Sequence, residues 1–143
     1  MSKIRSFIKY LNGEDRDEVW RVIKEHPEWY GKKLEPLWLL NNCFYGIYNE
    51  FGELMGFFSV NIWKFEVIVS WVYIKEEYRK QGLFNKIIKF VKEKYYEYIY
   101  ITISVVKENH IAREIYHKKF TFGGENEEKD GYWYVIVDRS KKV

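Results

Sequence analysis

Residues Ile68 to Val91 read IVSWVYIKEEYRKQGLFNKIIKFV, and this stretch joins two contrasting patterns. The segment from Val67 to Ile74 is apolar and rich in β-branched and aromatic residues, which predicts a buried strand. From Leu83 to Tyr95, apolar side chains recur at helical spacing while lysines occupy the other side, which predicts an amphipathic helix. A short basic loop that contains Gly82 connects the two. The stretch therefore predicts a strand, a basic loop and a helix in direct succession.

This succession has a chemical consequence at the start of the helix. Backbone N–H groups in the first turn of a helix lack an intrahelical acceptor, and the helix dipole adds positive charge there. A glycine in the loop lets a phosphate approach the backbone, and Gly82 stands at that position, with Arg79 and Lys80 before it. The loop is therefore a candidate phosphate site. An ordinary connection between a strand and a helix explains the same residues and stays open as the alternative.

The composition predicts one folded domain spanning residues 1–143, because 47% of the residues are hydrophobic and 31% are charged. The net charge is +3, but lysines are interleaved with glutamates, so a nucleic-acid partner is not indicated. Cys43 is the only cysteine, which excludes an intrachain disulfide and a cysteine cluster for a metal; its apolar neighbours predict a packing role. No run reaches about 18 apolar residues, so we expect a cytoplasmic protein without a membrane span.

The rest of the chain predicts an α/β fold (α+β mixed). Strands are expected over residues 4–10, 43–48, 54–62, 67–74, 98–106 and 132–137, with a further strand near 120–123. Helices are expected between Asn12 and Pro27, within residues 28–42, over 83–95 and over 109–119. This order is neither a regular βαβ alternation nor purely antiparallel. It therefore predicts a mixed sheet with helices on both faces.

Four local predictions accompany this order. Asn12 is a candidate helix N-cap. The aromatic segment from Trp29 to Trp38 is expected either to join the core or to line a substrate cleft. Gly123-Gly124 and Asp130-Gly131 are expected to bracket a polar hairpin. One side of the helix over 109–119 is expected to carry Ile111, Ala112, Ile115 and Tyr116.

Two motifs make the sequence resemble the GNAT superfamily of N-acetyltransferases. The first is the family's Q/R-x-x-G-x-G/A loop, matched from Arg79 to Phe84 directly after a strand. The second is a later N-x-x-A-x-x-x-Y helix, matched by Asn109, Ala112 and Tyr116. The resemblance covers residues 4–137. Phe84 departs from the Gly or Ala of the loop, and the Gly-Phe that usually follows the tyrosine is absent.

The resemblance implies the GNAT fold, in which about four helices flank a mixed, mostly antiparallel sheet of six or seven strands. It also implies acetyl-CoA as a co-substrate, with no metal, bound between the strand ending at Ile74 and the strand ending near Ser104. The pantetheine arm would pair with backbone of one strand and with Asn109, and the diphosphate would lie at the loop. The cofactor-binding residues implied in this way are Val72, Tyr73, Ile74, Arg79, Lys80, Gln81, Gly82, Leu83, Phe84, Asn85 and Asn109.

Two residues are candidates for acid–base chemistry. Tyr116 is expected to give a proton or hydrogen bond to the leaving thiolate, although a tyrosine of the core explains the same position. Some GNAT relatives use a Glu five residues before the Asn of the second motif, where this chain has Ser104. Glu66 lies on the same face of its predicted strand as the residues that face the cleft, so it is a candidate base that acts through water. A solvated carboxylate at a strand end remains the alternative for Glu66.

The resemblance therefore implies an acetyl-CoA-dependent N-acetyltransferase, in which a primary amine attacks the thioester directly in a ternary complex. The acceptor, a small molecule or a protein, is not identified by the sequence, and a homodimer stays open. The alternative is a non-catalytic GNAT-like module that binds CoA or a partner without transferring an acetyl group.

Overall fold

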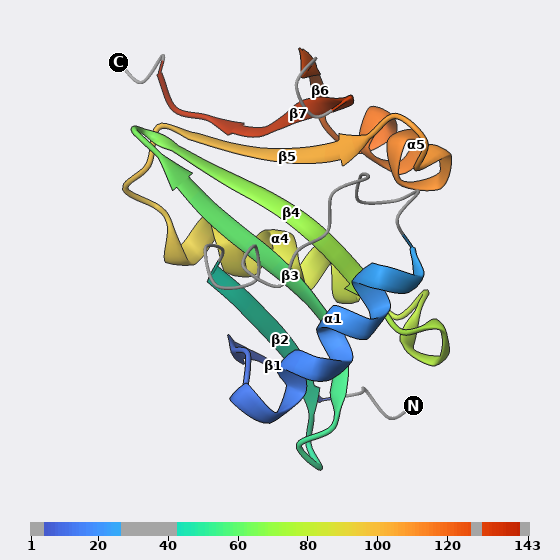
Figure 1. Cartoon of the computed structure of the whole chain (residues 1–143). Coiled ribbons are helices and arrows are strands. Elements are labelled where there is room, and N and C mark those ends of the chain that lie inside the picture. Colours follow the sequence, from blue (N-terminus) through green and yellow to red (C-terminus); the bar gives the residue numbers. More distant parts are fainter. Residues whose placement is uncertain (1–4, 27–42, 127–129, 141–143) are drawn as a thin grey trace.

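The computed structural model describes residues 5–26, 43–126 and 130–140, which form a seven-stranded sheet with helices packed against it (Figure 1). The strands lie in the order β1-β2-β3-β4-β5-β7-β6. Every neighbouring pair is antiparallel except β4 and β5, which run parallel. The mixed, mostly antiparallel sheet predicted from the sequence is therefore confirmed.

The elements follow the predicted order closely. The strands are β1 (Ser6–Tyr10), β2 (Cys43–Asn49), β3 (Leu54–Trp63), β4 (Glu66–Ile74), β5 (Tyr100–Val106), β6 (Thr121–Asn126) and β7 (Gly131–Asp138). The α-helices of the described residues are α1 (Arg16–Glu25), α4 (Leu83–Lys94) and α5 (His110–Lys119), and short 3-10 helices η1 (Gly13–Asp15) and η2 (Glu76–Tyr78) precede α1 and α4. The helix expected within residues 28–42, with its aromatic segment, lies outside the described residues.

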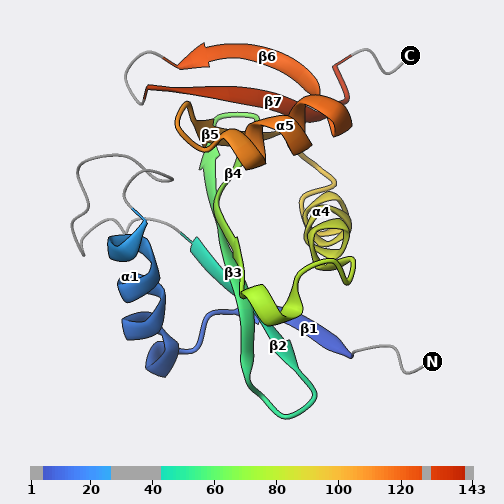
Figure 2. The same cartoon turned by 90° about the vertical axis from the view of Figure 1, so that its right-hand side faces the viewer.

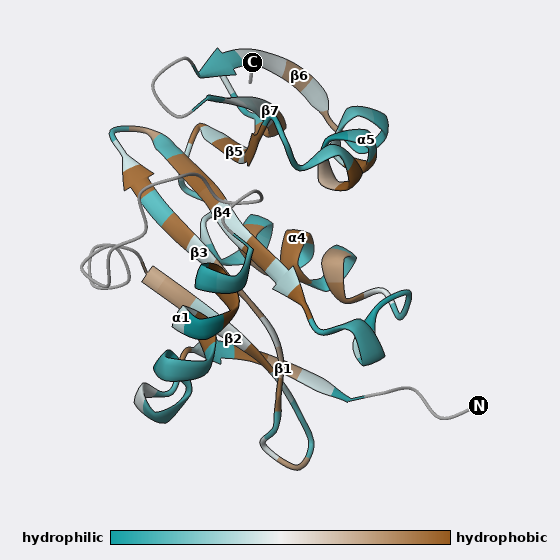
Figure 3. Cartoon of the chain, turned by 45° about the vertical axis from the view of Figure 1, so that its right-hand side comes forward, coloured by the Kyte–Doolittle hydropathy of each residue, from teal (hydrophilic) through white to brown (hydrophobic). Residues whose placement is uncertain are grey.

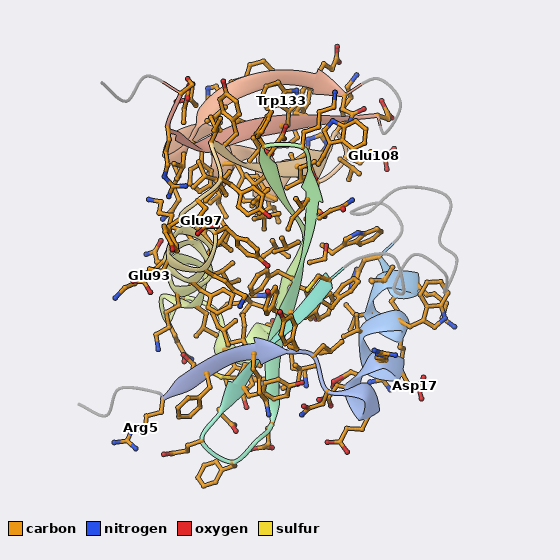
Figure 4. The ribbon with its side chains drawn as sticks, turned by 90° about the vertical axis from the view of Figure 1, so that its left-hand side faces the viewer. Arg5, Asp17, Glu93, Glu97, Glu108 and Trp133 are labelled. Carbon is orange, nitrogen blue, oxygen red and sulfur yellow. The ribbon has the colours of Figure 1, made fainter. Side chains whose placement is uncertain are left out.

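The helices form layers on both faces of the sheet. α1 packs on one face, and α4 and α5 pack on the other (Figure 2). The central strands are mostly hydrophobic, whereas α1 is largely hydrophilic (Figure 3). Exposed charged side chains such as Asp17, Glu93 and Glu97 lie at the periphery (Figure 4). Within the described residues, no helix combines the length and the apolar character needed to cross a membrane.

β4 and β5 are paired along only part of their length. Their parallel ladder runs from the pair Glu66↔Tyr100 to the pair Val69↔Ile103. Both strands continue beyond this last pair, β4 as far as Ile74, and they diverge as they do so (Figure 1). The sheet is therefore opened between two neighbouring strands, at the ends that lead into η2 and α5.

A β-bulge in β4 lies at the point where the strands part. Across the β3–β4 pair, Phe57 is opposite Tyr73, whereas Ser59 is opposite Ser70. β4 thus has one residue more than β3 in this interval, and Trp71 within it has a φ of 55°. A bulge bends the strand that carries the extra residue and increases its twist. The bulge is therefore the physical reason why the end of β4 turns away from β5.

The predicted hairpin is present, because β6 and β7 pair antiparallel, but Gly123 and Gly124 lie inside β6 and not at its end. A side chain at Gly123 would place its Cβ 2.1 Å from the ring of Trp133, and Gly124 has a φ of 153°. Trp133 lies on the neighbouring strand β7 (Figure 4). The glycines are therefore required because the indole ring covers the backbone of β6.

Two further local predictions are confirmed only in part. Ile111 and Ile115 are 74% and 42% exposed, because α5 packs on the sheet through Tyr116 and the half-buried Ala112. Asn12 is the N-cap of η1, whereas Asp15 is the N-cap of α1, and neither side chain makes a capping hydrogen bond. The N–H of Asn12 donates to the hydroxyl of Tyr48 at 3.0 Å.

Candidate functional site

At the start of α4, successive backbone N–H groups have no hydrogen-bond acceptor among the described residues. The N–H groups from Lys80 to Asn85 make no hydrogen bond within the described part of the chain, and the first bond of the helix is donated by Lys86 to the carbonyl of Gly82. Lys80 and Gly82 both have left-handed backbone conformations, with φ values of 62° and 80°. Alternating left-handed residues turn successive N–H groups toward one concave surface, which is a favourable geometry for an anion.

The approach to these donors is open at Gly82. Gly82 is exposed, and no atom lies within 4 Å of the position that a Cβ would occupy there. The helix dipole adds positive charge at the same end. The loop therefore combines unpaired donors, positive charge and access, which are the three properties that the sequence predicted for it.

Two side chains of the loop fix its shape. The Nε of Arg79 donates to the carbonyl of Ile74 at 2.8 Å, and its guanidinium lies 5.7 Å from the ring centre of Tyr73. The amide of Gln81 donates to the carbonyl of Glu77 at 3.2 Å. Both side chains are thus directed back along the chain. Arg79 thereby ties the loop to the end of β4, and Gln81 ties it to η2.

Phe84 packs beneath the helix. Its ring is stacked on Tyr116 with centroids 5.6 Å apart, and it also contacts Phe120 at 6.2 Å. Leu83 is buried in the core beside it. A bulky residue at position 84 is therefore accommodated by α5, and its backbone N–H remains available.

Lys119 lies beside the first turn of α4, a position that the sequence did not indicate. Its Nζ, on the last turn of α5, donates to the side-chain oxygen of Asn85 at 2.7 Å and lies 5.8 Å from the ring centre of Phe84. Lys119 is 34 residues from Asn85 in the sequence, so only the packing of α5 beside α4 brings them together. No local pattern could have identified this contact.

The residues predicted for the pantetheine arm lie on the two sides of the opening. Val72, Tyr73 and Ile74 are the last three residues of β4 and lie beyond its last pair with β5. Asn109 follows β5 and caps α5, where its side-chain oxygen accepts from the N–H of Ala112 at 3.3 Å. This cap uses the oxygen of Asn109 and leaves its amide NH₂ as a donor.

Tyr116 is enclosed by aromatic rings. It is 6% exposed and contacts Phe84, Phe120 and Tyr134 at centroid distances of 5.6 to 6.0 Å. Burial alone raises the pKa of its hydroxyl above the ordinary value. Tyr116 therefore stays protonated at neutral pH and is able to donate, but not to act as a base.

Glu66 begins β4 and is half-buried. One of its oxygens, Oε2, accepts a hydrogen bond of 2.7 Å from the hydroxyl of Thr102 on β5. Thr102 is 2% exposed and is one of two buried polar residues in the core of the described chain. Among the described residues, no group of three or more His, Cys, Asp or Glu side chains is arranged to hold a metal ion.

The comparisons with known proteins agree with this geometry. The sequence model of the acetyltransferase (GNAT) family matches residues 10–122 of the chain. A comparison with curated proteins found no match.

Three solved structures show the same fold. Diaminobutyrate acetyltransferase EctA from Paenibacillus lautus, in complex with L-2,4-diaminobutyric acid and coenzyme A, has a TM-score of 0.69 and 16% identity, covering 98% of this chain and 99% of that chain. NAA60 from Arabidopsis thaliana, in complex with a bisubstrate analogue, has a TM-score of 0.67 and 15% identity, covering 92% and 98%. The yncA protein from Salmonella typhimurium, with its cofactor acetyl-CoA, has a TM-score of 0.67 and 15% identity, covering 97% and 96%.

The family match spans most of the chain, and the fold agrees with these structures along nearly their whole length. The chain therefore belongs to the GNAT family of acetyltransferases.

Proposed function

We propose that this protein transfers an acetyl group from acetyl-CoA to a primary amine by direct attack in a ternary complex. The observation that carries the proposal is the run of unbonded N–H groups from Lys80 to Asn85, placed at the opening between β4 and β5. Family membership supplies the acetyl-transfer chemistry. Three structural relatives contain CoA, acetyl-CoA or a bisubstrate analogue, which supports the same choice of co-substrate.

In this proposal the diphosphate of acetyl-CoA accepts hydrogen bonds from the loop at the start of α4. Lys80 and Lys119 add positive charge beside it, since both are exposed and Lys119 is held at the first turn of α4. The pantetheine arm lies along Val72 to Ile74 and takes a hydrogen bond from the amide NH₂ of Asn109. The thioester is thereby directed into the opening between the strands.

The transfer step is an exchange of one bond for another at the acetyl carbonyl carbon. The neutral amine attacks this carbon, a C–N bond forms, the C–S bond breaks, and CoA leaves as a thiolate. Tyr116 donates a hydrogen bond or proton to the thiolate, as its protonated state at neutral pH allows. Glu66 takes the proton that the attacking amine loses, through an intervening water. The products are the N-acetylated amine and CoA.

A second candidate function has one observation in its favour. Tyr116 packs against three aromatic rings, which is the environment of a structural tyrosine. A GNAT-like module that binds CoA or a partner without catalysis would keep the same packing. The two functions differ in whether CoA is released from acetyl-CoA in the presence of an amine.

The test is a transfer assay with a panel of primary amines. Purified protein is incubated with acetyl-CoA and either L-2,4-diaminobutyrate, a peptide with a free N-terminus, or a lysine peptide with a blocked N-terminus. We expect thiol release that depends on one of these amines, together with a mass increase of the amine by one acetyl group. Binding of acetyl-CoA without transfer to any amine would favour the non-catalytic module. A folded protein that neither binds acetyl-CoA nor transfers its acetyl group would refute both candidates.

A further inference from the structure

We propose that Thr102 is a positioning residue that holds the carboxylate of Glu66 for the attacking amine. This inference rests on the proposed function. Its starting point is the 2.7 Å hydrogen bond from the Thr102 hydroxyl to Oε2 of Glu66. Thr102 is 2% exposed, and β-branching restricts the rotamer of its side chain. The core of the sheet therefore holds the hydroxyl of Thr102 in place, and this hydroxyl in turn holds the carboxylate of Glu66.

The register of β4 and β5 shows the direction in which Glu66 leans. Glu66 is paired with Tyr100, whereas Thr102 is paired with Ile68. The carboxylate thus reaches a partner two residues further along the sheet, which is about 7 Å at 3.3 Å per residue. That position is one pair before the last pair, Val69↔Ile103. Thr102 therefore draws the carboxylate of Glu66 from the start of the strand toward the opening.

Among the described residues, Thr102 is the one partner of the Glu66 carboxylate. Within the described residues, no ion pair and no second hydrogen bond involves Glu66. A half-buried carboxylate without a cation is costly, and a single hydroxyl donor offsets only part of that cost. Because Thr102 uses Oε2, the other oxygen remains to accept from water or from an amine. This arrangement suits a site that receives a cationic substrate.

The strand faces separate Glu66 from Tyr116. Val67 and Val69 belong to the core on the α4 and α5 side, as do Ile101 and Ile103. Because side chains alternate along a strand, Glu66 and Thr102 lie on the opposite face, which carries α1. Tyr116 lies on the α5 side. The amine is therefore expected to arrive from the α1 face of the opening, while the thiolate is protonated from the other face.

The experiment compares four variants with the panel amine that the wild type acetylates fastest. Thr102→Val keeps the shape and loses the donor, Thr102→Ser keeps the donor, Glu66→Gln removes the charge, and the fourth variant combines Thr102→Val with Glu66→Gln. We expect kcat to fall by about tenfold in Thr102→Val, the size of a lost hydrogen bond to a charged group. We expect about a hundredfold fall in Glu66→Gln. The KM for acetyl-CoA should stay within twofold (about the scatter of such measurements), and Thr102→Ser should restore kcat.

The double variant separates positioning from a structural role. If Thr102 acts through Glu66, adding Thr102→Val to Glu66→Gln lowers kcat no further, because the two effects are not additive. Additive losses in the double variant, or an unchanged kcat in Thr102→Val, would overturn the inference while leaving acetyl transfer intact. Absence of transfer by the wild type to every panel amine would overturn the proposed function, and this inference with it. Circular dichroism on each variant confirms that it is folded.

Discussion

Replacement of Tyr116 by Phe separates the two roles that this residue can have. The substitution keeps the ring, and with it the contacts to Phe84, Phe120 and Tyr134. It removes only the hydroxyl, whose raised pKa has burial as its sole cause and which makes no hydrogen bond within the described residues. A proton donor to the thiolate depends on that hydroxyl. A structural tyrosine depends on the ring.

The hydroxyl and the ring of Tyr116 are expected to contribute different amounts to stability and to catalysis. Loss of a hydroxyl that has no protein partner is expected to change the free energy of unfolding by less than about 0.5 kcal/mol. Loss of the ring in Tyr116→Leu removes three aromatic contacts of about 0.5–1.5 kcal/mol each, so a destabilisation of roughly 1.5–4.5 kcal/mol is expected. Loss of a general acid is expected to lower kcat by about a hundredfold, equivalent to about 2.7 kcal/mol of transition-state stabilisation.

The assay combines urea unfolding with initial rates of thiol release at saturating acetyl-CoA. We expect Tyr116→Phe to have the unfolding midpoint of the wild type and a strongly reduced kcat. Tyr134→Phe is the matched control, because it removes a hydroxyl from the same aromatic cluster and should leave kcat unchanged. If Tyr116→Phe keeps a kcat within twofold of the wild type, the assignment of Tyr116 as the proton donor is refuted (twofold being about the resolution of such rates).

Three further predictions concern stability. Tyr45→Phe leaves the hydroxyl of Tyr95 without the hydroxyl partner that lies 2.6 Å away in the core. Urea unfolding should therefore show a free energy of unfolding lower by about 1–3 kcal/mol. An unchanged unfolding midpoint would show that this hydrogen bond does not stabilise the fold. Burial and the acidic neighbours raise the pKa of Tyr48 from 10.0 to about 12, so its protonated form stabilises the fold fully below pH 10.0, and this contribution is lost as the pH rises through about 12. Unfolding measured across this alkaline range should show the loss, and a smaller one in Tyr48→Phe; a flat profile would contradict it. Gly56→Ala places a Cβ 2.4 Å from the carbonyl oxygen of Tyr73, so it should destabilise the protein by about 1–3 kcal/mol in thermal unfolding. A variant as stable as the wild type would show that the backbone of β4 moves away from the added Cβ at no cost.

The fold was largely predictable because its strongest signals are local. The apolar run of β4 and the helical spacing of α4 are each contained within a dozen residues, and both elements form where expected. Leu83, Ile87 and Val91 are buried as the spacing predicts. The loop between the elements has the donor geometry inferred from Gly82 at the start of a helix, since the left-handed conformation there is one that glycine adopts readily.

The predictions that are confirmed only in part involve contacts between different elements. Gly123 and Gly124 resemble turn residues, but Trp133 on the next strand explains them. A hydrophobic pattern placed Ile111 and Ile115 on one side of the helix with Tyr116, but only the way in which α5 meets the sheet decides which of these residues are covered. Local periodicity carries no information on either contact.

The same limit applies to the candidate site. Motifs identified the loop and Tyr116, because each is a short pattern in one element. Thr102 and Lys119 act across strands or helices, and nothing in their immediate sequence distinguishes them from other polar residues. The bulge at Trp71, which opens the sheet, also depends on the register with β3. The chemistry of a single element was therefore predictable, whereas the assembly of the site was not.

The most direct test of the proposed co-substrate site is a calorimetric titration of acetyl-CoA and CoA into the wild type, Gly82→Asn and Gly82→Asp. Asn and Asp have the same shape and tolerate the left-handed backbone of Gly82, so the two variants differ only in charge. A carboxylate about 4 Å from the diphosphate costs roughly 1–4 kcal/mol between water and a protein surface. We predict that the wild type and Gly82→Asn bind, and that Gly82→Asp binds at least about fivefold more weakly. Equal affinities of the Asn and Asp variants, or no binding by a folded wild type, would contradict a diphosphate site at the start of α4.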